Sequence, residues 1–138
     1  MSLQISRRER EGIVIFDLTG RLVVGSSTNQ FREALSTALA EGSVNSILNL
    51  KGVEYIDSTG LGALVLCFTQ CQKAGGALKL LNLNRREMEL LLLTKLTTVF
   101  DVYNDEQDAV NGFFPDREIR RFDILSFVKQ HQDEDEID

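Results

Sequence analysis

Residues 53–66 read VEYIDSTGLGALVL, in which an apolar approach is broken by an acid, two hydroxyls and two glycines before a second apolar run. After Ser58, Leu61, Leu64 and Val65 recur at helical spacing, which predicts an amphipathic helix that follows a strand and a loop. Ser58 then stands where that helix begins. Its hydroxyl either caps the helix or is a site at which charge is added and removed.

The two interpretations of Ser58 rest on the same local physics. A serine cap accepts a backbone N–H of the first turn and is worth about 1 kcal/mol. The unpaired amides and the positive end of the helix dipole also favour a phosphate there, and Gly60 and Gly62 permit a close approach. A phosphate would add about −1.5 to −2 charges beside Asp57 and repel an acidic docking partner. Asp57 itself either orients the hydroxyl or turns the chain.

The segments before this stretch read as a hairpin, a helix and a strand. Two β-rich runs, LQISRRE and IVIFDLTGRLV, flank the charged turn EREG and predict an opening hairpin. A helix is expected from about 27 to 41, with a capping box over Ser27 to Gln30 and a stop at Gly42. Residues 44–50 predict an interior strand, and residues 51–57 a loop.

The segments after this stretch repeat the strand-to-helix order. The central helix should end at Gly75 and Gly76, ALKLLNL should form a strand, and Asn84 to Glu87 form a capping box for the next helix. VFDVY and DEQDAV predict a last strand and a short helix. Strands that alternate with helices pair in parallel, so an α/β fold is expected over 1–112, with a mixed sheet, mostly parallel, and helices packed against it.

Residues 113–138 form a C-terminal extension with a different pattern. Pro115 suits the entry to a helix, and Ile119, Phe122, Leu125 and Val128 share one stripe of it. That helix either packs back on its own domain or contacts a second protein. The final DEDEID is expected to be a solvated, disordered tail.

Composition and charge exclude several classes of protein. The 138 residues are 43% hydrophobic and 26% charged, as in a globular domain, and residues 1–112 carry only −2 of the net charge of −6. Without a basic stripe, direct nucleic-acid binding is not expected. No run is long enough to span a membrane and no secretory signal opens the chain, so a cytoplasmic location is expected. Cys67 and Cys71 are expected to be core residues. No metal site, cofactor or disulfide is predicted.

One family shares these features in order and spacing. VEYIDSTGLGALVL, preceded by FDLTGRLV and SILNL and followed by GGALKLLNL and LTKLTTVFDVY, resembles the STAS domain of bacterial anti-sigma-factor antagonists over residues 3 to 112. The D-S-T-G-L-G stretch is the specific part. It lies at the position that the family places between its third strand and second helix.

The resemblance implies that the chain regulates transcription by partner switching, in which phosphorylation decides whether two proteins bind each other. In the family, the serine that matches Ser58 is phosphorylated by an anti-sigma factor that is also a serine kinase of the histidine-kinase-like ATPase fold, and the phosphate blocks binding. A PP2C-type phosphatase restores the active form, which sequesters the kinase and frees a sigma factor. The expected partner-binding residues are Asp57, Thr59, Gly60, Leu61 and Gly62, and the domain is a phosphoacceptor rather than an enzyme.

The chain departs from the family pattern at three positions. Val23 and Asn49 stand where the family often has acids, and Lys95 stands where L-T-G-L is common. These changes leave the identity of the kinase open. The sequence does not determine the oligomeric state, and a homo-oligomer is possible.

Two other functions compete with the partner switch. Enzymatic activity has little support, because D-S-T-G has one residue more than the D-[ST]-G loop of aspartic proteases and no second copy supplies a partner carboxylate. The sequence also has no nucleophile elbow and no P-loop. A STAS scaffold in a multiprotein signalling or lipid-transport assembly is the alternative to the switch. Thr59 is a second hydroxyl that could accept the phosphate, although the motif position favours Ser58.

Overall fold

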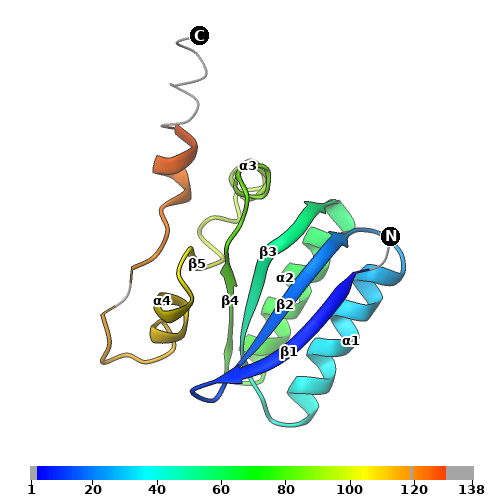
Figure 1. Cartoon of the computed structure of the whole chain (residues 1–138), viewed down its shortest axis with the longest axis vertical. Coiled ribbons are helices and arrows are strands. Elements are labelled where there is room, and N and C mark those ends of the chain that lie inside the picture. The colour runs from blue at the N-terminus through cyan, green and yellow to red at the C-terminus, as the bar shows by residue number, and fades with distance from the viewer. Residues whose placement is uncertain (1–2, 119, 130–138) are drawn as a thin grey trace.

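The computed structural model describes residues 3–118 and 120–129, and the DEDEID tail lies outside them. The chain forms one five-stranded sheet in the order β1-β2-β3-β4-β5, with helices between the strands (Figure 1). The elements are β1 (Gln4–Arg10), β2 (Ile13–Leu22), α1 (Ser26–Ala40), β3 (Asn45–Ile56), α2 (Ser58–Lys73), β4 (Ala77–Leu81), α3 (Arg85–Leu93), β5 (Val102–Tyr103) and α4 (Glu106–Asn111).

The sheet is mixed, as the sequence predicts. β1 pairs antiparallel with β2, while β2, β3, β4 and β5 pair in parallel. The hairpin turn is Glu11 and Gly12, with φ of 52° and 81°. A two-residue turn with positive φ at both central residues matches the right-handed twist of the two strands that it connects.

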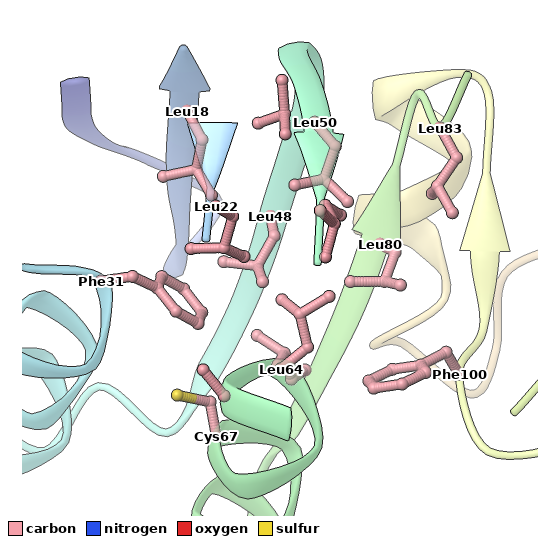
Figure 2. Packing of buried hydrophobic residues seen from close by; sticks show 14 of the residues in the cluster. Leu18, Leu22, Phe31, Leu48, Leu50, Leu64, Cys67, Leu80, Leu83 and Phe100 are labelled. Atoms are coloured by element: carbon pink, nitrogen blue, oxygen red, sulfur yellow. The ribbon is translucent and has the colours of Figure 1, made fainter. Parts of the chain in front are cut away.

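The two faces of the sheet are covered differently. α1 and α2 lie on one side (Figure 1), where the main core gathers Phe31 from α1, Leu64 and Cys67 from α2, and Leu48 and Leu80 from the strands (Figure 2). A smaller cluster on the other side packs α4 against alternate strand residues. Its buried members are Ile13, Ile15, Ile47, Leu81, Tyr103, Ala109 and Val110.

A polar ladder crosses four segments on the α4 side of the sheet. The Arg8 Nε donates to Asp17 Oδ2 at 2.7 Å, and the Asn49 Nδ2 donates to Asp17 Oδ1 at 2.8 Å. Asn82 in turn donates to Asn49 at 3.1 Å. The hydrogen bond from Arg8 holds the pKa of Asp17 below its usual value. Asn49 supplies an N–H that an aspartate would lack, so its departure from the family pattern fits this ladder.

The third strand is longer than predicted. The loop predicted over residues 51–57 is wrong for residues 51–56, because β3 continues to Ile56 and pairs with β2 as far as Leu22. Val53 and Ile56 point into the main core, which gives the extra residues a buried face. The last strand is shorter than VFDVY, since only Val102 and Tyr103 pair with β4.

The capping box predicted over Ser27 to Gln30 is wrong. Gly25 is the N-cap of α1, with φ of 110° and no side-chain cap. The Ser27 Oγ instead accepts the Val23 N–H at 3.0 Å and donates to the Val23 carbonyl at 2.8 Å. The box over Asn84 to Glu87 is confirmed, with both reciprocal bonds present.

The helix predicted from Pro115 is found only over residues 124–129 of the described chain. Asp123 accepts the Ser126 N–H at 3.2 Å, which starts the helix later and shifts its buried face to Ile124 and Val128. Leu125, predicted in the stripe, is 60% exposed, and Ile119 lies outside the described residues.

The described part of the extension packs back on its own domain. The Phe122 N–H donates to the Val102 carbonyl at 2.8 Å, and the rings of Phe122 and Phe127 pack against the main core.

Candidate functional site

Asp57 connects the end of β3 to the first turn of α2. Its backbone is extended, and its Oδ1 accepts the Gly60 N–H at 2.8 Å, so Asp57 is the N-cap of α2. The other oxygen, Oδ2, accepts the Val24 N–H at 2.9 Å. Both oxygens therefore bind backbone, which favours the turning role of Asp57 over orientation of a hydroxyl.

Asp57 is held in its charged form. Desolvation alone would raise the pKa of its carboxyl, but the N–H groups of Gly60, Val24 and Thr59 outweigh that effect, and the pKa lies below its usual value. A full negative charge therefore sits beside position 58 at neutral pH.

Ser58 is the first residue of α2 and is exposed. The interpretation of Ser58 as the helix cap is wrong, because Asp57 occupies that position and makes the capping bond. Among the described residues, the structure gives the Ser58 hydroxyl no hydrogen bond. Its oxygen is therefore free to react without loss of an interaction that supports the fold.

The remaining residues of the D-S-T-G-L-G stretch divide between the surface and the core. Thr59 and Gly62 are exposed, whereas Gly60 and Leu61 are buried. A Cβ at Gly60 would lie 2.1 Å from the Leu22 carbonyl oxygen, so this glycine lets α2 pack against the end of β2. A Cβ at Gly62 would meet nothing within 4 Å.

A groove of about 360 Å³ begins beside this stretch and runs between the starts of α1 and α2. Thr59 and Gly62 line it together with Val24, Arg32 and Leu66. Val24 is 70% exposed and Leu66 38% exposed, which is unusual for large apolar side chains. The groove thus combines apolar walls with one cationic side chain.

Sequence reasoning missed Val24, Arg32 and Leu66. One signal was available for Leu66, because it falls outside the stripe formed by Leu61 and Leu64 in the same helix. Val24 and Arg32 gave no signal, since only the folded chain brings the β2–α1 loop beside Thr59.

Cys67 and Cys71 are free and buried in the main core. Burial raises the pKa of their thiols to about 12 and about 11, which leaves them as protonated, unreactive core residues. Residues 3–118 and 120–129 contain no group of three or more metal-ligating side chains, and no helix there has the length and hydropathy to cross a membrane.

The sequence matches a family model and several curated proteins. The model of the STAS domain matches residues 4–109. A Bacillus subtilis protein named anti-sigma-B factor antagonist is 35% identical over 110 residues, which cover 80% of this chain and 99% of the relative. The anti-sigma F factor antagonist of Paenibacillus polymyxa is 27% identical over 113 residues, covering 80% and 94%.

Solved structures share the fold at lower identity. An anti-sigma factor antagonist from Mycobacterium paratuberculosis has a TM-score of 0.70 at 19% identity and covers 81% of this chain and 94% of its own. Bacillus SpoIIAA in its phosphorylated form has a TM-score of 0.63 at 21% identity and covers 80% and 98%. The family model and the fold together define a STAS domain.

The chain belongs to the STAS-domain family of anti-sigma-factor antagonists. Both curated relatives to which it is similar here are named as anti-sigma factor antagonists.

Proposed function

We propose that this chain is an anti-sigma-factor antagonist that binds a serine-kinase anti-sigma factor at the start of α2. The kinase phosphorylates Ser58, and the phosphate ends the interaction. A PP2C-type phosphatase removes the phosphate and restores binding. Relatives named anti-sigma factor antagonists support this assignment, and the D-S-T-G-L-G stretch supports the choice of site.

The observation that carries the proposal is the exposed hydroxyl of Ser58 at a helix start where another residue already makes the cap. A phosphate there lies at the positive end of the helix dipole. It breaks no hydrogen bond that the fold needs. Modification therefore leaves the fold intact.

The same phosphate strongly changes the docking surface. Asp57 already carries one negative charge, and phosphorylation adds about 1.5 to 2 more at the adjacent residue. The groove lined by Val24 and Leu66 starts at the next residue, Thr59. A partner that covers this surface would have to desolvate the added charge, so it dissociates.

Incubation of the full chain with candidate kinases and ATP, followed by peptide mapping, tests the proposal. Phosphate on Ser58, absent from Ser58→Ala and retained in Thr59→Val, is the expected result. Phosphate on Thr59 alone would move the switch to the neighbouring hydroxyl. If neither residue is modified by any candidate kinase, the scaffold function becomes the better account.

A further inference from the structure

A second pocket lies on the α3 side of the candidate site. It measures about 210 Å³ and lies between the end of β3 and α3. Tyr55 and Ile56, which line it, directly precede Asp57 and Ser58 in the chain. The pocket therefore lies at the end of β3 that leads directly into the candidate site.

The walls of this pocket are mostly apolar and partly open to solvent. Leu90 and Leu93 line it from α3, and Tyr55 and Ile56 line it from β3. Leu93 is 81% exposed and Tyr55 is 43% exposed. Exposed large apolar side chains that gather around a hollow are typical of an interaction site.

One polar group in the lining has an unsatisfied atom. Glu87 is only 2% exposed, and its Oε1 accepts the Asn84 N–H at 3.0 Å in the capping box. Its Oε2 is buried and has no hydrogen-bond partner within the described residues. A buried acceptor without a donor costs free energy, and a donor brought by a ligand would recover it.

The chemistry of the lining selects among donors. Arg86 and Glu89 also line the pocket with opposite charges, so these two residues together favour neither a cationic nor an anionic ligand. The apolar walls and the Tyr55 ring favour an aromatic body. A tyrosine or tryptophan side chain combines such a body with a single O–H or N–H donor, and these residues are common anchors at the centre of interfaces.

We propose that this pocket is the anchor site for a tyrosine or tryptophan side chain of the partner that docks at Ser58, with Glu87 Oε2 accepting the O–H or N–H of that side chain. The identity of the partner rests on the proposed function. The chemistry of the pocket does not, because it follows from Glu87 and the apolar walls.

Two small probes test the pocket without any kinase. p-Cresol reproduces the tyrosine side chain, whereas 4-methylanisole has the same ring and no donor. Each is titrated at pH 8 into the full chain labelled with ¹⁵N, and amide shifts are followed. We expect p-cresol to shift the amides of Tyr55, Leu90 and Leu93 and to bind about five-fold more tightly than 4-methylanisole, as one net hydrogen bond implies.

Variants separate the hydrogen bond from the apolar walls. Glu87→Met should abolish the preference for p-cresol, and Leu93→Ser should weaken both probes. Leu125→Ser, at another exposed leucine, should change neither. Equal binding of the two probes to the unmodified chain, or shifts confined to the groove at Val24, would overturn the assignment. Since no phosphate is involved, that failure is distinct from a failure to modify Ser58.

Discussion

The carboxylate of Asp57 accepts the backbone N–H of Val24 at 2.9 Å, although the two residues are 33 positions apart. The same carboxylate caps α2 through Gly60. One side chain thus fixes the helix start that carries Ser58 and the loop that carries the exposed Val24. The two parts of the candidate docking surface are held together by this bond.

Asp57→Ala should lower the free energy of unfolding by about 1–2 kcal/mol, because the cap and the bond to Val24 are both lost. Asp57→Asn keeps an oxygen that accepts the Gly60 N–H, so its loss should be smaller. Urea denaturation of the three proteins measures the difference. An alanine variant as stable as the unmodified chain would show that neither bond contributes.

Ser58→Asp should leave the free energy of unfolding within about 0.5 kcal/mol of the unmodified chain, since Ser58 is exposed and makes no bond that the fold needs. Binding to the kinase should fall strongly, because the added charge lies beside the ionised Asp57. Ser58→Ala should bind throughout and resist modification. Calorimetric titration measures binding, and equal affinities of the two variants would contradict the charge argument.

Gly60 and Gly62 form a matched pair two residues apart in one helix. Gly60→Ala should lower stability by about 3 kcal/mol or more, since its Cβ would overlap the Leu22 carbonyl. Gly62→Ala should raise stability by about 0.5–1 kcal/mol, since its Cβ meets open space and alanine favours the helix. Thermal unfolding measures both, and changes of the same sign would show that the close approach at Gly60 is absent.

Lys95 has a left-handed backbone, with φ of 62°, at the end of α3. The Leu96 N–H donates to the Leu91 carbonyl at 2.8 Å, which is the bond that follows a residue of this conformation at a helix end. Lys95→Gly should therefore raise the free energy of unfolding by about 1 kcal/mol. Lys95→Ala keeps the steric cost and should show no such gain in the same denaturation experiment.

Burial raises the pKa of Glu87 from its usual 4.5 to about 7, against the opposing hydrogen bond from Asn84. The folded chain therefore binds a proton more readily than the unfolded chain between these values, and stability falls as pH rises from 4.5 to 7. The loss is on the order of 3 kcal/mol. Glu87→Gln, which can keep the capping bond, should remove this part of the pH dependence.

The comparison of Glu87→Gln with the unmodified chain isolates Glu87 from other carboxylates. Asp57 has a lowered pKa and acts in the opposite direction, because its contribution is lost as pH falls through its folded pKa. Stability curves from pH 4 to 8 for both proteins measure the difference. If their difference is constant across that range, Glu87 titrates as an exposed acid does.

The sequence by itself determined the order of strands and helices, the mixed sheet and the position of Ser58 at the start of a helix. These features depend on residues that are close together in the sequence. Their signals are the spacing of apolar residues, the glycines that end helices and the D-S-T-G pattern. The capping box at Asn84 was readable for the same reason. Its two partners are three residues apart.

Only the tertiary structure decided which residue caps α2 and which side chains surround Ser58. Aspartate and serine are both favourable N-cap residues. Asp57 is the cap here because the fold brings the Val24 N–H to its carboxylate, and this bond holds the side chain in place. The length of β3 was likewise set by its pairing with β2. The packing of the C-terminal extension on its own domain followed from contacts of Phe122 with β5 and the core. These outcomes depend on segments far apart in sequence, and local propensity carries no information about such contacts.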